Sequence, residues 1–121
     1  MSGFHKYYLP AILWALVIFF FSSLPSSAVK SLSPQLDDLV LHFIEFSIFG
    51  FLLTRAIIQN PHRISWKLCI VVALIGIVYA ASDETHQLFV QGRFATVSDF
   101  LADSIGVIFG MSIFIYVQKT F

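Results

Sequence analysis

Four long runs of apolar residues organise the sequence, and short polar segments separate them. The runs cover about residues 9–24, 39–58, 65–81 and 97–117. Each run is close to the roughly 20 residues that an α-helix needs to cross the hydrocarbon core of a bilayer. The pattern predicts an all-α membrane protein, a four-transmembrane-helix bundle that forms a single domain over residues 1–121.

The composition agrees with this fold class. Hydrophobic residues make up 58% of the chain and charged residues only 12%, and the mean hydropathy is +0.86. A soluble domain carries roughly 25% charged residues, so we expect membrane lipid around this chain. The formal net charge is zero, and without a basic excess we expect no nucleic-acid partner. The oligomeric state has no signature in the sequence.

The first apolar run has a second interpretation. Lys6, the run itself and the small residues at 26–28 would also suit a signal peptide with its cleavage site. Cleavage would leave three spans and remove the loop that follows the first run. We therefore favour a retained helix, in which Pro10 occupies the first turn, where proline is tolerated.

Polar residues concentrate between the third and fourth runs. The stretch from Ser82 to Arg93 holds two acids, a histidine, two glutamines and an arginine. Ionisable groups at or inside a membrane segment are costly, and they usually face the bundle interior or an aqueous cavity. This stretch is therefore the first candidate for a functional site.

Two further polar sets lie on single faces of predicted helices. Asp38, His42 and Glu45 are spaced i, i+4, i+7 in the second run, which places them on one face. In the fourth run, a stripe of similar spacing has two acids followed by two small residues: Asp99, Asp103, Gly106 and Gly110. Small residues allow close helix approach, so we expect this stripe to face into the bundle.

The distribution of Lys and Arg predicts the orientation. With a cytoplasmic N-terminus, two basic residues lie outside, Lys30 and Arg93. The other basic residues then lie on the cytoplasmic side: Lys6, Arg55, Arg63, Lys67 and Lys119. We therefore expect both termini in the cytoplasm and the polar site toward the extracytoplasmic side.

The polar residues support three hypotheses about chemistry. General acid–base catalysis would use the clustered carboxylates, which are Glu45, Asp83, Glu84, Asp99 and Asp103. A divalent metal would be held by an imidazole and carboxylate set, because these ligands suit Zn, Mn or Fe; the candidates are His42, His86 and Asp38. Substrate binding would use polar groups that can receive a phosphate or carboxylate, namely Arg93, Gln87 and Ser82.

A purely structural network would need the same residue types. In that interpretation Asp38 fixes His42, and Asp99 or Asp103 neutralises Arg93. The sequence contains no His-Glu-x-x-His motif and no cysteine pair, which leaves both interpretations open. Whether the chain is an enzyme, and which cofactor it uses, stays open with them.

A family resemblance rests on these residues. The polar stretch at 82–93 and the face of Asp38, His42 and Glu45 closely resemble motifs of the VanZ-like family of small bacterial membrane proteins. The resemblance implies a four-span, multi-pass protein of the bacterial plasma (inner) membrane. The family's founding members are associated with low-level resistance to the glycopeptide teicoplanin, whose target is an extracytoplasmic cell-wall precursor.

The resemblance therefore implies a role in the cell envelope. We expect an outward-facing polar site that binds or remodels a cell-wall or lipid-linked component. Its partner would be a lipid-linked cell-wall precursor or a glycopeptide antibiotic. The alternative is a membrane-embedded, metal-dependent enzyme that acts on a lipid or isoprenoid-linked substrate.

Overall fold

The computed structural model describes residues 2–32, 35 and 37–121, and all regular secondary structure in them is helical. The elements follow in the order η1 (Phe4–Tyr8, a π-helical turn), α1 (Leu9–Ser22), α2 (Ser26–Leu32), α3 (Asp38–Ile57), η2 (Pro61–Arg63, a 3-10 turn), α4 (Trp66–Gln87) and α5 (Val97–Thr120). Among the described residues, four helical segments are long and apolar enough to cross a membrane, and the first of them joins η1 to α1. The prediction of an all-α membrane protein with four such helices is confirmed.

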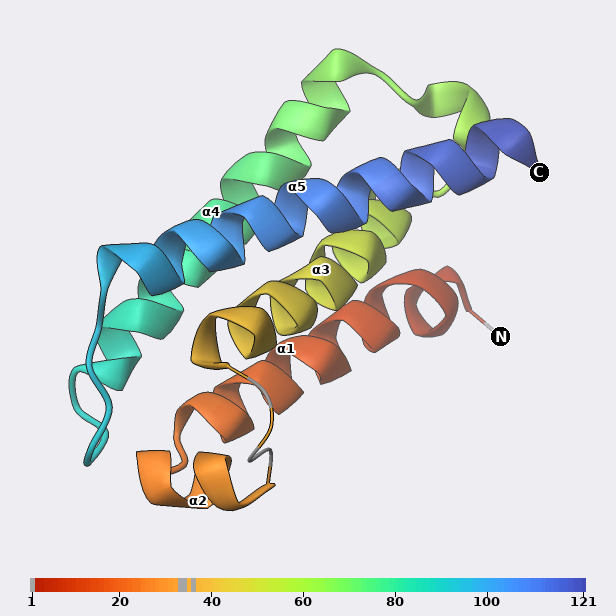
Figure 1. Ribbon diagram of the computed structural model, residues 1–121. Coiled ribbons are helices and arrows are strands. Elements are labelled where there is room, and N and C mark those ends of the chain that lie inside the picture. Colours follow the sequence, from red (N-terminus) through yellow and green to blue (C-terminus); the bar gives the residue numbers. More distant parts are fainter. Residues whose placement is uncertain (1, 33–34, 36) are drawn as a thin grey trace.

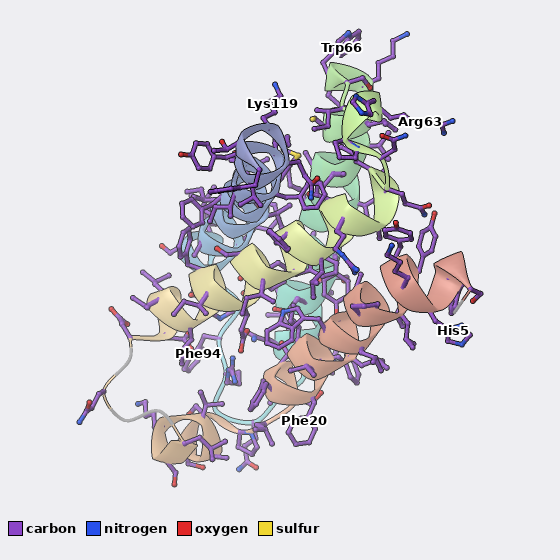
Figure 2. All side chains as sticks on the ribbon, turned by 90° about the vertical axis from the view of Figure 1, so that its right-hand side faces the viewer. His5, Phe20, Arg63, Trp66, Phe94 and Lys119 are labelled. Carbon is purple, nitrogen blue, oxygen red and sulfur yellow. The ribbon has the colours of Figure 1, made fainter. Side chains whose placement is uncertain are left out.

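The two ends of the bundle differ in character. Both termini and the connection between α3 and α4 lie at one end, whereas α2 and the α4–α5 loop lie at the other (Figure 1). We call the second end, made of the described residues of 22–45 and 82–103, the polar end. Every acidic residue of the chain falls in these two ranges. Arg63, Trp66 and Lys119 project from the opposite end (Figure 2).

Helix α4 continues past residue 81, where the third apolar run ends, and stops only at Gln87. The first half of the polar stretch is therefore helical rather than part of a loop. A helix makes its backbone hydrogen bonds within its own segment whatever its side chains are. Asp83, Glu84 and Gln87 are buried in the bundle, so the change from apolar to polar residues does not end the helix.

Helices α3 and α5 pack along a seam of small residues, which we call the glycine seam: Gly106 and Gly110 of α5 against the backbone of α3. A Cβ built on Gly106 would lie 2.7 Å from the carbonyl oxygen of Phe43, and one on Gly110 would lie 2.7 Å from the backbone nitrogen of Phe51. Only glycine lets the two backbones come this close. Both glycines and the two acids on the same stripe are buried, as the helical spacing predicted.

The core lies between α1, α3, α4 and α5, around Ile18, Phe46, Phe49, Ala80 and Val107. Helix α1 is also tied to its neighbours by hydrogen bonds to backbone carbonyl oxygens. One joins the indole nitrogen of Trp14 to the carbonyl of Glu45 at 2.8 Å, and another runs from the Tyr79 hydroxyl to the carbonyl of Ala15. The first of these bonds ties α1 to α3 at the edge of the polar end.

Candidate functional site

His42, on α3, lies at the centre of the polar end and is 3% exposed. Its Nδ1 atom is 2.7 Å from Oδ1 of Asp103 and 3.7 Å from Oε1 of Glu84. On the other side of the ring, Nε2 is 3.5 Å from Oδ2 of Asp38 and 4.0 Å from Oδ2 of Asp99. One imidazole therefore stands between two groups of carboxylates that come from α3, α4 and α5.

The first turn of α5 positions three of these acids. The Thr96 hydroxyl caps the helix by accepting a hydrogen bond from the backbone N–H of Asp99 at 3.0 Å. The backbone N–H of Thr96 in turn donates to Oε2 of Glu84 at 3.3 Å. Asp103 follows one turn after Asp99 on the same face of α5. The cap thus connects the start of α5 to the last turns of α4 and holds the carboxylates around His42.

Helix α1 reaches the site through Ser22. The Ser22 hydroxyl donates to Oδ1 of Asp83 and accepts a hydrogen bond from Nε2 of Gln87 at 2.9 Å. All three side chains are buried. Sequence reasoning did not assign Ser22 to the site, because a serine in a membrane helix usually bonds its own backbone. Its only signal is its position at the end of the first apolar run.

Arg93 follows a tight turn in the α4–α5 loop. The turn is closed by a hydrogen bond from the Arg93 N–H to the carbonyl of Val90 at 3.2 Å. Gly92 has a φ of 75°, in the left-handed region that favours glycine. The guanidinium Nη1 donates to the carbonyl oxygens of Leu24 at 3.2 Å and Phe21 at 3.5 Å. Arg93 therefore bonds the C-terminal end of α1, where carbonyls lack helical partners.

The pairing of Arg93 with Asp99 or Asp103, which a structural network would require, is not observed. Among the described residues, each ion-pair contact within 4.0 Å joins a carboxylate to His42. The other contact expected of a structural network, between Asp38 and His42, is present, because the Asp38 carboxylate approaches the imidazole. Arg93 is thus a cation held by neutral acceptors, in a site whose acids gather around a histidine.

Two adjoining cavities open beside these residues. The inner cavity, of about 170 Å³, has polar lining residues that include His42, Glu45, Gln87 and Arg93. The second, which we call the groove, has a volume of about 790 Å³ and is lined by Lys30, Asp38, Arg93, Phe94 and Asp99 among others. Asp38 and Arg93 line both cavities and so stand at their junction. Helix α2, for which the sequence offered no site residue, supplies Val29 to both walls.

Two residues proposed for the site lie apart from His42. The His86 ring is 2.9 Å from the Ser23 hydroxyl oxygen and stacks on a phenylalanine of α1. Ser82 is exposed, and its hydroxyl donates to a backbone carbonyl within α4 at 2.7 Å. Of the three proposed metal ligands, the structure brings together His42 and Asp38 but not His86.

Three buried polar atoms of the site have no hydrogen-bond partner among the residues that the structure describes: His42 Nε2, Glu84 Oε1 and Asp103 Oδ2. A buried polar group without a partner costs about 1–3 kcal/mol, and more when it is charged. Such atoms are able to bind a ligand. Two sets of side chains could hold a metal ion, because inside each set the ligand atoms lie within 4.8 Å of one another. One set is His42, Asp83, Glu84 and Asp103, and the other is Asp38, His42 and Asp99. Sets of this kind can hold a cation or exchange protons with a bound molecule.

Comparison with known proteins gives one match. The family model described as VanZ/LLP1 matches residues 7–118. The match includes all but the outermost residues of the four long helices, the lining of both cavities and every residue around His42. No curated protein and no solved structure matches the chain.

Proposed function

The chain belongs to the VanZ/LLP1 family, and we propose that its polar end binds the anionic headgroup of a lipid-linked envelope component. Arg93 is the main contact in this proposal. The observation that carries it is the position of Arg93 at the junction of the two cavities, where its guanidinium bonds two backbone carbonyls and no described carboxylate within 4.0 Å. A guanidinium held by neutral acceptors keeps its full charge, and its remaining N–H groups can bind a phosphate or carboxylate.

The surroundings of the groove support a ligand with a hydrocarbon tail. Phe89 and Phe94 of the α4–α5 loop are 84% and 80% exposed, and Val97 at the start of α5 is 74% exposed. Phe94 also lines the groove, and an exposed aromatic side chain beside a polar cavity suits a molecule with both kinds of surface. A lipid-linked cell-wall precursor has this structure. Asp38 and Asp99, which also line the groove, would accept hydrogen bonds from hydroxyl or amine groups of the same headgroup.

We further propose that the protein lies in the bacterial plasma membrane with its polar end outside. The excess of Lys and Arg toward the opposite end supports this orientation, because cytoplasmic segments carry such an excess. A precursor held at the outer face would be the form that a glycopeptide encounters. Low-level teicoplanin resistance would then follow from competition with the antibiotic for its target.

Labelling tests the orientation. In a variant with Cys69→Ala and Gln91→Cys, we expect the new thiol to react with an impermeant reagent added outside intact cells. Gln91 lies exposed in the α4–α5 loop, so access is limited only by the membrane. Labelling that occurs only after cell lysis would place the polar end in the cytoplasm.

Substitution of Arg93 tests the function. We expect Arg93→Gln to weaken binding of a polyprenyl phosphate to the detergent-solubilised protein by about 10-fold or more, since a hydrogen bond to a charged group contributes roughly 1.5–3 kcal/mol. Native mass spectrometry measures the binding. The matched control is Arg63→Gln, at the opposite end of the bundle, which should bind like the wild type. Equal binding by the Arg93 variant would reject the proposal.

A second candidate function is a membrane enzyme acting on the same kind of ligand. Its support is the cluster of carboxylates around His42 together with Glu45, which lines the inner cavity, where a proton could pass to or from a bound molecule. Incubation with a labelled polyprenyl diphosphate separates the two functions. Release of phosphate that disappears in a Glu45→Gln variant would favour the enzyme. Binding without release would favour the headgroup receptor.

A further inference from the structure

We infer that the polar end holds one divalent transition-metal ion, bound by Nε2 of His42 and one carboxylate oxygen each of Asp38 and Asp99. Zn²⁺ and Mn²⁺ represent the class of ion that such a mixed imidazole and carboxylate set prefers. The inference goes beyond the proposed headgroup binding and does not depend on it, because the metal ion alone serves as the probe.

The distances fit a shared ion. Nε2 of His42 is 3.5 Å from Oδ2 of Asp38 and 4.0 Å from Oδ2 of Asp99. Ligand atoms bound at ordinary zinc distances in a tetrahedron lie about 3.4 Å apart. The three side chains offer atoms that all lie within 4.8 Å of one another. Asp38 and His42 are one turn apart on α3, and Asp99 is in the first turn of α5, so two rigid helices supply the set.

The state of Nε2 points to a missing cation. The atom is buried and makes no hydrogen bond among the residues that the structure describes. If it carried a proton, the nearest described carboxylate oxygen would be 3.5 Å away, beyond ordinary hydrogen-bond length; if it carried a lone pair, the pair would face two carboxylates. No described Lys or Arg lies within 4.0 Å of these carboxylates. A cation between the three groups would satisfy the nitrogen and both acids together.

Asp103 prepares the imidazole for this role. It is 0% exposed, and its Oδ1 lies 2.7 Å from Nδ1 of His42. A neutral His42 that donates to the Asp103 carboxylate carries its hydrogen on Nδ1, so the lone pair is left on Nε2. Histidines that bind metals are commonly oriented by a carboxylate in this way. Asp103 is thus a positioning residue rather than a ligand.

The Nδ1 side of the His42 ring is a poorer metal site. Nδ1 is already bonded to Asp103, and Asp83 accepts the Ser22 hydroxyl. An ion bound to Nδ1 would have to replace the bond to Asp103. On the Nε2 side, Asp38 and Asp99 line the groove, which gives an ion a path of entry and leaves a coordination position facing the cavity.

Metal analysis tests the inference. The protein, purified without chelator and with any affinity tag removed, should contain about one equivalent of a transition metal by inductively coupled plasma mass spectrometry. Stripped protein should bind Zn²⁺ in a calorimetric titration, and Asp99→Asn should weaken that binding by at least about 10-fold. Asp103→Asn should weaken it by about 10- to 100-fold, because the amide lacks the negative charge that makes the imidazole a more basic ligand. Asp37→Asn is the matched control, because Asp37 lines the same groove next to Asp38 and should bind like the wild type.

Two measurements distinguish a loss of metal binding from a folding defect. The elution volume in gel filtration and the thermal midpoint of the metal-free protein should be unchanged in Asp99→Asn, and added Zn²⁺ should raise the midpoint only in proteins that keep the site. Wild-type protein that binds no stoichiometric metal would overturn the inference. So would metal binding that survives Asp99→Asn but is lost in Glu84→Gln, because the ion would then lie on the Nδ1 side.

Discussion

The two halves of the contact between α3 and α5 differ sharply in their chemistry. Along the glycine seam the two backbones approach so closely that a Cβ at Gly106 would lie 2.7 Å from a carbonyl oxygen. One turn toward the polar end, the same pair of helices carries His42 and Asp103. Together with Glu84 of α4 they have three buried polar atoms that lack hydrogen-bond partners among the described residues. The first half is closed by packing, whereas the second is left chemically open.

This contrast distinguishes the contacts that stabilise the bundle from the residues that are available to a ligand. Without a hydrophobic driving force between helices in lipid, close packing of small residues supplies much of their association. Unpartnered polar atoms oppose folding. They are retained here beside two cavities, which suggests that a ligand completes them. Substitutions in the two halves should therefore act on different observables.

The largest effect on stability is expected at the seam. Gly106→Val should reduce the free energy of unfolding by about 3 kcal/mol or more, because backbone atoms of α3 cannot move aside for the new side chain. The thermal midpoint in detergent and the yield of monodisperse protein measure the loss. Gly3→Val is the matched control, since a Cβ at Gly3 meets nothing within 4 Å. A stable Gly106→Val protein would show that the seam does not hold the helices.

A smaller loss of stability is expected where Ser22 joins α1 to the buried polar side chains of α4. Ser22→Ala should cost about 1–3 kcal/mol, because it leaves buried Asp83 and Gln87 without their shared partner. Thermal unfolding in detergent measures it. Ser23→Ala is the comparison, because its hydroxyl is exposed, and its change should stay within about 0.5 kcal/mol. Equal losses in the two variants would remove Ser22 from the polar network.

The smallest effect on stability is expected within the polar end. Asp103→Asn should change the free energy of unfolding by no more than about 1 kcal/mol, because an amide oxygen can still accept the hydrogen bond from Nδ1 of His42. We nevertheless expect the variant to lose the proposed protection against teicoplanin, measured as the antibiotic susceptibility of cells that produce it. If cells that produce the variant resist teicoplanin as well as cells that produce the wild-type protein, the result would count against the whole cluster.

Much of this architecture could be predicted from the sequence. Hydropathy revealed four membrane-length helices, because exposed polar residues are excluded from hydrocarbon whatever the tertiary structure is. Helical spacing placed Asp99 and Asp103 on the stripe of Gly106 and Gly110, because three and four residues return the helix to the same face. The same spacing placed Asp38 and His42 together.

Other features depend on contacts that no local pattern contains. Helix α4 extends past the apolar run at 65–81, because its acids are buried in the bundle and continue a helix whose end hydropathy alone does not mark. The partners of Arg93 are backbone carbonyls, which every residue possesses and no sequence pattern marks. His86 and Asp99 carry equally plausible metal-binding groups, and only the rotation of α4 and α5 decides that Asp99 faces His42 while His86 faces α1.

The hydrogen bond from Trp14 to the carbonyl of Glu45 makes the fluorescence of Trp14 an intrinsic reporter of the contact between α1 and α3. The sequence has two tryptophans, and the other, Trp66, is 69% exposed at the opposite end. A Trp66→Phe variant would leave one emitter, whose indole is bonded to α3 within the segment that carries His42. Its emission would shift to longer wavelengths whenever α1 separates from α3 and water replaces the carbonyl. Opening of the polar end could then be followed in solution without any attached dye.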